Sequence, residues 1–325
     1  MRPPNRFCFL LVAALAGATL LGCNDAGRNE SVKLANEGNA ALNRKQYDDA
    51  IVQLKKAVEK YRDNHVAWYG LGLAHMSRKQ HAEAVDALGN AARIVDDQPM
   101  YHMWLGIAMT MKAEAQAREE QARKESKKPE EVELDLGAVN FESALQHLQQ
   151  AVKLRGDLWR AHYNLGLIYR NGDKSKEAAE SFTKAIAANP REQGPYVALA
   201  ELYSRWDYVD QAIQVASQGT ANVPGAAERA DIWYVLGMGY DSKRLDDKAV
   251  ESFSKALEDR RDHHKAKFQR GQALFRKGDF SRAKRDLEDF VKTGSSKLDL
   301  QKTQASKMLM DIVAASAEAT AESPK

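Results

Sequence analysis

The chain has 325 residues, and 48 basic against 45 acidic side chains leave it a formal charge of +3. So even a balance does not favour nucleic acid or an anionic membrane surface as a partner. Alanine, leucine, lysine and glutamate abound and only 8 residues are proline. This composition is typical of an all-helical protein.

Residues 1–22 have the form of a secretory signal peptide. Two arginines, Arg2 and Arg6, precede an uncharged apolar run over 7–21. A run of 15 residues is too short for a bilayer span, which needs about 20, and fits the apolar part of a signal peptide. The run ends in Leu-Leu-Gly-Cys, which resembles the lipobox of bacterial lipoproteins. That resemblance implies cleavage before Cys23 and acylation of its thiol. An ordinary secretory signal followed by a chance cysteine is the alternative.

The cysteine content fits a lipid anchor. The second cysteine, Cys8, lies inside the signal peptide, so the mature chain has no pair of thiols for a disulfide. Each acyl chain contributes ~0.8 kcal/mol per buried CH₂ to membrane binding. In the lipoprotein family, Asn24 after the cysteine implies the outer membrane, because aspartate there is the usual signal for inner-membrane retention. We expect an exported protein, lipid-anchored to the outer membrane and facing the periplasm, with 23–30 as a flexible tether.

Two columns of small residues recur with a period of 34. Large apolar residues stand between them at helical spacing, and a polar turn such as 276–280 separates two helical stretches in each period. Each period therefore predicts a pair of helices. Neither helix can bury its apolar stripe alone, so the pairs must stack. The first column is Gly38, Gly72, Gly106, Gly166, Ala200, Gly237 and Gly271, and the second is Ala50, Ala84, Ala144, Ala178, Ala212, Ala249 and Ala283.

These columns and their period resemble the tetratricopeptide repeat, over about 31–294. The resemblance implies an all-α fold, a right-handed superhelix (α-solenoid) of about seven helix pairs. Gly219 and Phe290 stand where the family prefers alanine. The expected units are 31–64, 65–98, 99–158, 159–192, 193–226, 230–263 and 264–294.

The third unit carries 26 extra residues between Gly106 and Ala144. Residues 113–124 are strong helix formers with opposite charges three and four places apart. We expect the first helix of this unit to continue to about Lys127 and stop near Pro129, before an acidic loop over 130–135. The insertion is either a tolerated surface elaboration or a second docking surface.

The C-terminal end is expected to close the array. Residues 295–313 have the spacing of one more amphipathic helix, which would cap the last repeat and keep its apolar face from water. Residues 314–325 are small and polar and are expected to be disordered.

No pattern in the sequence indicates catalysis, a cofactor or a metal ion. The eight histidines form no His-Glu-x-x-His and no compact cluster with carboxylates, and there is no nucleotide-binding fingerprint. His75, His102 and His162 stand where helix packing favours an aromatic ring. We therefore expect no enzyme and no cofactor.

The resemblance also implies a binding groove. In the family the first helices line a concave surface, with places 2, 5, 9, 12 and 13 of each unit facing inward, and these offsets share one face of a helix. Methionine and aromatic residues in the first half, with arginines from the middle onwards, suit an apolar protein partner that carries acidic groups. The alternative is that these residues are core, or that the insertion folds back over them. The expected groove residues are Tyr69, Leu73, Met76, Met100, Met103, Ile107, Met111, Arg160, Tyr163, Leu167, Arg170, Arg205, Tyr234, Met238 and Phe268.

The groove lacks the family's carboxylate clamp, which needs basic residues and asparagine at set places. Ala35, Tyr69 and Met103 occupy the fifth place of the first three units. At the level of a lipobox plus tetratricopeptide repeats, the chain resembles pilotin-type lipoproteins that assist secretin assembly and lipoproteins that organise cell-wall or polysaccharide machinery. We expect a membrane-anchored interaction scaffold or adaptor that binds no nucleic acid. The alternative is a self-assembling structural component that acts as a homo-oligomer.

Overall fold

The computed structural model describes residues 26–294 and 298–321. The predicted signal peptide and the lipidation site at Cys23 lie outside the described residues. Within the described ranges the chain forms fifteen α-helices, two short 3₁₀ turns and no strand. This confirms the all-α class. The helices belong to two compact units, which divide between Asn164 and Leu165 and are described separately.

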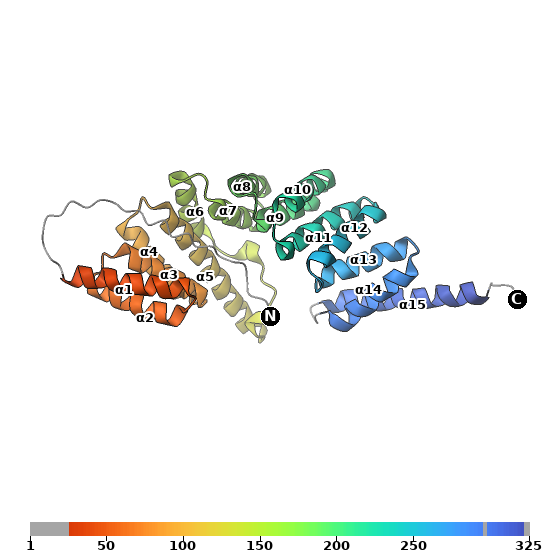
Figure 1. The fold of residues 1–325 in the computed structure, drawn as a ribbon, viewed down its shortest axis with the longest axis horizontal. Coiled ribbons are helices and arrows are strands. Elements are labelled where there is room, and N and C mark those ends of the chain that lie inside the picture. Colours follow the sequence, from red (N-terminus) through yellow and green to blue (C-terminus); the bar gives the residue numbers. More distant parts are fainter. Residues whose placement is uncertain (1–25, 295–297, 322–325) are drawn as a thin grey trace. The chain divides into compact units, whose positions relative to one another are not determined.

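The N-terminal unit is a series of helix pairs in which each helix packs on the next, from α1 to α6 (Figure 1). The 3₁₀ turns η1 (Pro129–Glu131) and η2 (Leu136–Ala138) lie between α5 and α6. The helices are α1 (Ala26–Asn43), α2 (Tyr47–Lys60), α3 (His65–Ser77), α4 (His81–Ile94), α5 (Pro99–Glu125), α6 (Glu142–Leu154) and the first residues of α7 (Trp159–Asn171).

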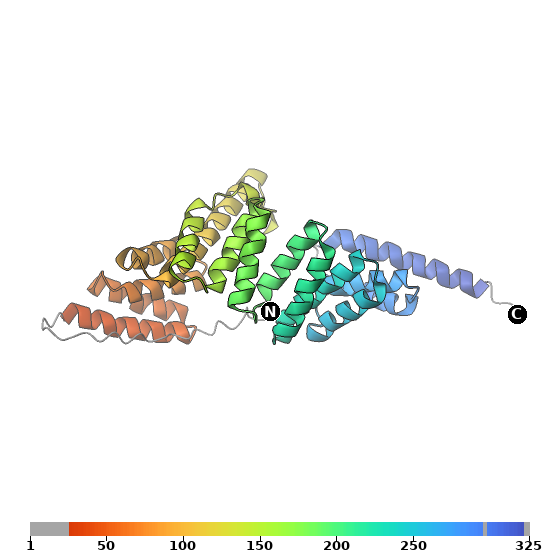
Figure 2. The same ribbon diagram turned by 90° about the horizontal axis from the view of Figure 1, so that it is seen from above.

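The C-terminal unit continues the same arrangement (Figure 2), with α14 packing on the final helix α15. Its helices after α7 are α8 (Ser175–Ala188), α9 (Gln193–Arg205), α10 (Val209–Asn222), α11 (Ala226–Ser242), α12 (Asp246–Asp259), α13 (His264–Arg276), α14 (Phe280–Thr293) and α15 (Asp299–Ala321).

The first column of small residues sets the close approach of the two helices in each pair. A Cβ on Gly166 would lie 2.5 Å from Cε1 of Phe182, and one on Gly72 would lie 2.4 Å from Cγ of Leu88. No real Cβ sits so close, so a large second-helix side chain occupies the space that glycine leaves. The same contact joins Gly38 to Leu54, Gly106 to Leu148, Gly237 to Phe253 and Gly271 to Leu287. The fifth pair has buried Ala200 instead, and there the second-helix place holds the small Ala216.

The turn inside each pair is also repeated. In six of the seven pairs, all but the third with its insertion, one residue at the same place of the turn has a positive φ, for example 59° at Lys79 and 77° at Gly278. The next amide then donates back to a carbonyl five residues earlier, as from Gln80 to His75 O (2.9 Å), which satisfies a free carbonyl at the helix end. The other residues of this kind are Lys45, Asp173, Asp207 and Arg244.

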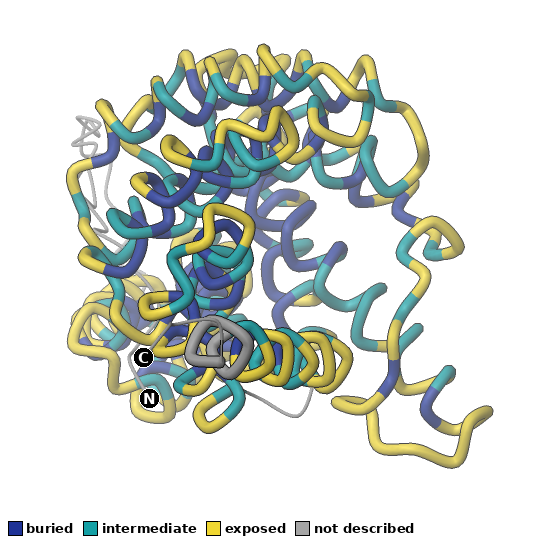
Figure 3. The backbone as a smooth tube through the Cα atoms, turned by 90° about the vertical axis from the view of Figure 1, so that its right-hand side faces the viewer, coloured by how far each residue is buried: buried dark blue, intermediate teal, exposed yellow. Residues whose placement is uncertain are grey.

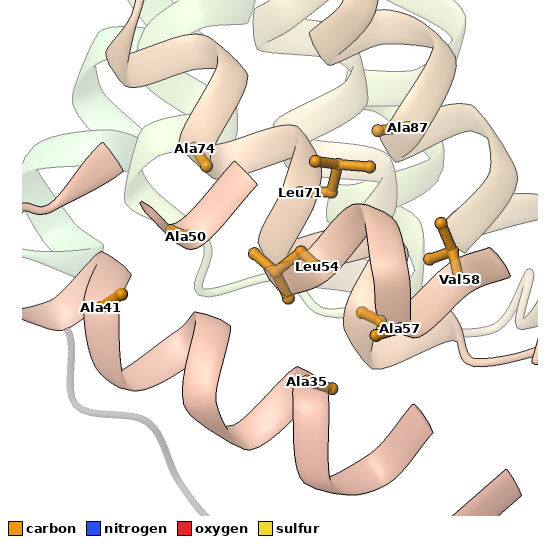
Figure 4. Close-up of a cluster of buried hydrophobic side chains, with 10 residues drawn as sticks. Ala35, Ala41, Ala50, Leu54, Ala57, Val58, Leu71, Ala74 and Ala87 are labelled. Carbon is orange, nitrogen blue, oxygen red and sulfur yellow. The ribbon is translucent and has the colours of Figure 1, made fainter. Parts of the chain in front are cut away.

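Buried and exposed positions alternate along the helices (Figure 3). In the first cluster, mainly alanine and leucine side chains from α1 to α4 meet (Figure 4), among them Leu54 and Leu71. A buried polar chain crosses from the first pair to the second: Asn64 donates to Ser31 Oγ (2.9 Å), which donates to Ala57 O (2.6 Å). Buried polar groups of this kind are stable only when their hydrogen bonds are made.

The chain begins its first helix earlier than expected. The predicted tether extends to residue 30, whereas α1 starts at Ala26, so the prediction is wrong for 26–30. Two contacts with the end of α2 hold this extra turn. Glu30 pairs with Lys60 at 3.0 Å, and the Arg28 guanidinium lies 5.8 Å from the centre of the Tyr61 ring.

Two further helix ends differ from the predictions. The sixth pair starts at Ala226, four residues before the predicted unit, because Arg229 in the added turn makes a two-pronged ion pair with Asp259 (2.8 Å for both bonds). Helix α15 continues to Ala321, so the tail is helical well past residue 313. Its sequence there is rich in alanine, the strongest helix former.

The long helix α5 ends at Glu125, two residues short of the predicted end, where Ser126 adopts a left-handed conformation (φ 53°). It runs past the ends of its neighbours in the N-terminal unit (Figures 1 and 2). None of the helices within 26–294 and 298–321 combines the length and apolarity that a membrane span requires.

Candidate functional site

The first helices of the N-terminal unit bring an aromatic cluster together. We call the side of α3, α5 and the start of α7 that carries it the first-helix face. The rings of Tyr69 (α3) and Tyr101 (α5) are 4.9 Å apart, and the Tyr101 hydroxyl lies 2.7 Å from Nδ1 of His65. The Arg160 guanidinium stands 4.3 Å from the centre of the Trp159 ring, which fixes its direction.

Burial stabilises the neutral form of two tyrosine hydroxyls in this cluster. Burial raises the pKa of Tyr69 far above its ordinary value and Tyr101 adds to this, while a hydrogen bond with Trp104 and the charge of Arg160 oppose it. Burial also raises the pKa of Tyr101 to about 12. Both hydroxyls therefore stay neutral at ordinary pH and act as hydrogen-bonding groups.

The structure divides the predicted groove residues of this unit into two sets. Leu73, Met103 and Ile107 are buried, with Met103 only 2% exposed. Helix α3, which carries Leu73, packs against α2 and α4, and α5, which carries Met103 and Ile107, packs against α4 and α6. These three side chains therefore belong to the core and offer no surface to a partner. The half-buried set, which keeps some accessible surface, comprises Tyr69, Met76, Met100, Met111, Arg160 and Tyr163.

The insertion folds back on the helix that it extends. Arg118 of α5 donates to the carbonyl of Val132 (3.1 Å), and both Val132 and Ala122 are buried. The 3₁₀ turn η1 packs on α5. The return segment is thus held by its own apolar contacts.

In the C-terminal unit the predicted residues lie on α7, α9, α11 and α13. Arg170 approaches Glu201 of the next pair at 4.0 Å. Burial, with the nearby carboxylates of Glu201 and Asp241, raises the pKa of Tyr234 to about 12. Phe268 is 4% exposed and belongs to the core, Arg205 is exposed, and the half-buried residues are Leu167, Arg170, Tyr234 and Met238.

A small pocket of about 180 Å³ lies where α11, α13 and α14 meet the final helix. Its volume suits one side chain rather than a free metabolite, since ligand pockets usually measure ~300–1,000 Å³. The sequence predicts a capping helix, but it does not predict that Leu298 and Gln301 at the start of this segment line a pocket. The lining residues are Tyr234, Lys265, Phe268, Gln269, Phe290, Leu298 and Gln301.

Several ring nitrogens at one repeated place have a structural role. Trp68 Nε1 donates to Arg62 O (2.7 Å), His102 Nε2 to Asp96 O (2.6 Å) and His162 Nε2 to Gly156 O (2.8 Å). In each case the ring ties the start of a first helix to the turn before it. Across the described part of the chain, histidine, cysteine and carboxylate side chains form no group of three or more that could hold a metal ion.

The model of the tetratricopeptide repeat family matches residues 36–108, 130–192 and 234–289, which is more than half of the chain. The chain belongs to the tetratricopeptide repeat family. The matched ranges include helices from six of the seven pairs and leave out the fifth pair, α9 and α10, which contains Ala200 and Gly219. At Gly219 the space that a Cβ would take is filled by Tyr196, whose Cγ would lie 2.8 Å away, and by Ile232, whose Cγ2 would lie 3.0 Å away.

Solved tetratricopeptide repeat structures share the fold. PilF of Pseudomonas aeruginosa has 17% identity and a TM-score of 0.54, with 74% of this chain and 96% of that chain covered. A tetratricopeptide repeat protein of Parabacteroides merdae has 14% identity and a TM-score of 0.54, over 88% of this chain and 99% of that chain. The Cut9–Hcn1 complex of the APC/C has 13% identity and a TM-score of 0.54, with 89% of this chain and 47% of that chain covered. These likenesses concern the fold alone. Among curated proteins, no sequence matches this one.

Proposed function

We propose that this protein is a membrane-anchored scaffold of the bacterial envelope, which binds other proteins, catalyses nothing and helps to assemble or organise an envelope complex. The observation that carries the proposal is a tetratricopeptide repeat array that follows a signal-like segment ending in a lipobox-like Cys23. Lipid chains at Cys23 would hold the array at the outer membrane, facing the periplasm.

The first-helix face of the N-terminal unit is the proposed docking surface. Met76, Met100 and Met111 keep partial exposure there, and methionine adapts to irregular apolar partners. Arg160, set on the Trp159 ring, adds a cation of fixed direction. These features suit a partner segment with apolar side chains and an acidic group.

The docking surface is tested by the variant Arg160→Ala/Tyr163→Ala. Removal of interface aromatic and arginine side chains commonly costs ~2 kcal/mol or more of binding free energy, so recovery of the cross-linked envelope partner should fall about thirtyfold. The matched control is Gln146→Ala/Lys153→Ala, which truncates exposed residues of the second helix α6. Equal recovery from both variants, with unchanged helical melting, would place the docking surface elsewhere.

The anchor is tested separately, by Cys23→Ala. Without the thiol no acyl chain can be attached, and the protein should move from the membrane fraction to the soluble fraction or remain uncleaved. The measurement is fractionation of cells with immunodetection of the precursor and mature forms. A variant that is processed and retained like the parent would overturn the lipoprotein proposal.

A further inference from the structure

The small pocket beside the final helix is lined on one part by apolar side chains. The rings of Phe268 and Phe290 lie 5.0 Å apart, and these two residues are 4% and 0% exposed. Leu298, which precedes α15, adds an aliphatic side chain, and we call these three residues the pocket floor. A floor of this kind binds an apolar group, and a volume of about 180 Å³ limits that group to one side chain.

The remaining lining residues are polar, and none of them is engaged by the chain itself. We call Tyr234, Lys265, Gln269 and Gln301 the pocket rim. Within the part of the chain that the structure describes, none of these four side chains forms a hydrogen bond or an ion pair. Several polar groups without partners that converge on an apolar floor are the usual composition of a binding site.

Lys265 determines the charge of the ligand, because the other lining residues are neutral. Its neighbour Lys267 is paired with Asp289, whereas Lys265 is exposed and has no carboxylate partner among the described residues. Burial raises the pKa of Tyr234 to about 12, so the hydroxyl of that residue carries no charge at ordinary pH. The pocket thus has a single positive charge, and a complementary ligand has one carboxylate beside an apolar group.

The two carboxamides of the rim indicate a polypeptide that continues on both sides of the inserted side chain. Gln269 belongs to α13 and Gln301 to α15, and each carboxamide offers both donors and an acceptor. The main-chain N–H and C=O groups that flank an inserted residue need both kinds of partner. A free C-terminal carboxylate accepts hydrogen bonds only, and it would leave the acceptor oxygens of both carboxamides unused.

We infer that this pocket is a second docking site, which binds one leucine or phenylalanine side chain from an internal segment of a protein partner and pairs Lys265 with the carboxylate of an adjacent aspartate or glutamate. The inference rests on the proposed function, because it requires a protein partner. It adds a site in the C-terminal unit to the first-helix face of the N-terminal unit.

Short peptides test the site. The full chain, purified in detergent, is passed over the immobilised peptide Gly-Leu-Glu-Gly-amide, attached through an N-terminal linker, and surface plasmon resonance gives the dissociation constant. Replacement of the leucine by serine removes the apolar group, and replacement of the glutamate by glutamine removes the charge. Each change should weaken binding about tenfold or more.

Variants of the protein test the role of Lys265. Lys265→Gln should weaken binding of the leucine–glutamate peptide about tenfold. The matched control is Lys292→Gln, which removes an exposed cation of α14 outside the pocket and should bind like the parent. Lys265→Glu should reverse the preference, so that a leucine–lysine peptide binds better than the leucine–glutamate peptide. Both lysines are exposed, so the three variants should melt like the parent.

Several outcomes would overturn the inference. These are a parent that does not bind the leucine–glutamate peptide, equal binding of the serine–glutamate peptide, and a Lys265→Gln variant that binds like the parent. Tighter binding of a peptide that ends in a free C-terminal leucine would also overturn it, because the occupant would then be a chain terminus. Arg160→Ala/Tyr163→Ala should leave peptide binding unchanged, so failure of this site and failure of the first-helix face are distinguishable.

Discussion

At the scale of single residues, the absence of a side chain controls how closely the paired helices approach. Gly166 lets the Phe182 ring reach the backbone of α7, and five other pairs repeat this contact with leucine or phenylalanine. Protein interiors pack densely enough that one added methyl group is felt. The column of small residues in the sequence therefore marks the points at which the two helices of each pair approach closely.

Gly166→Leu should be strongly destabilising. The new side chain would enter the volume of the Phe182 ring, and overpacking of this kind costs ~1–3 kcal/mol. The matched control is Gly89→Ala on α4, where a Cβ meets nothing within 4 Å. That change should leave the free energy of unfolding unchanged or raise it by up to ~1 kcal/mol, since alanine is the better helix former. Thermal melts of both variants decide the matter, and equal melting temperatures would contradict the assigned packing.

His102 of α5 and His147 of α6 form a hydrogen-bonded pair between the two helices. Their Nδ1 atoms are 3.1 Å apart while the ring centres are 5.3 Å apart, so the rings meet edge to edge through these nitrogens. His102 must donate from Nε2 to Asp96 O, so its Nδ1 accepts and His147 donates. Burial, and then the neighbouring His102, lower the pKa of His147.

A lowered pKa of His147 reduces the stability of the fold in acid. Below the ordinary pKa of about 6.5 the unfolded chain binds a proton at His147 that the folded chain takes up less readily, so stability should fall as the pH drops through that value. His147→Gln removes this titration. Denaturant unfolding at pH 7.5 and 5.5 should therefore show a smaller loss of stability in the variant than in the parent. The same loss in both would mean that burial does not lower the pKa of His147 as described.

At the scale of helices, the sequence pattern locates most elements. The predicted units that start at His65, Pro99, Trp159, Gln193 and His264 coincide with the first residues of α3, α5, α7, α9 and α13. The pattern works there because a turn residue and an apolar stripe both mark the boundary. It fails at Ala26 and Ala226, where ion pairs with a neighbouring helix extend the first turn, and such pairs involve residues 30 positions apart.

The candidate site was less predictable than the helices. The helical offsets placed Met103 and Phe268 on the same side as Tyr69 and Tyr234, but the structure buries both of them. Which residues of that side remain accessible depends on how closely the next pair packs, and this distance is not encoded by one helix alone. The periodicity of the sequence thus indicates which residues share the inner side of each helix, but it does not determine which of them are exposed.

The extension of α5 should be dispensable for folding. Deletion of 113–138 would restore the usual interval between Gly106 and Ala144, and the hydrogen bond from Arg118 to Val132 lies entirely within the deleted segment. We expect the shortened chain to melt within a few degrees of the parent, with fewer helical residues by circular dichroism. Collapse of the fold would show that the extension supports its neighbours.

At the scale of the whole molecule, stability should accumulate from pair to pair within each of the two units, because successive helices of a unit pack on one another. Ion pairs recur at equivalent places, with Arg78 on Asp48 (3.0 Å) and Lys243 on Asp210 (2.6 Å). Exposed pairs of this kind contribute only ~0–1 kcal/mol each. The apolar contacts between helices therefore supply most of the stability. The half-buried side chains on the first-helix face lie outside these contacts in part, and that exposed part is available to a partner.

Site-specific photo-cross-linking tests most directly whether this protein is a scaffold that holds a partner on its first-helix face. A photoreactive residue is placed at Met76 or Met100, both half-buried on first helices, and at Glu83 or Lys153, both exposed on second helices. After irradiation of whole cells, the first two positions should give the same cross-linked envelope protein, and the second two should give none. Cross-links from Glu83 and Lys153 that equal those from Met76 and Met100, or a first-helix face that cross-links to nothing, would contradict the account.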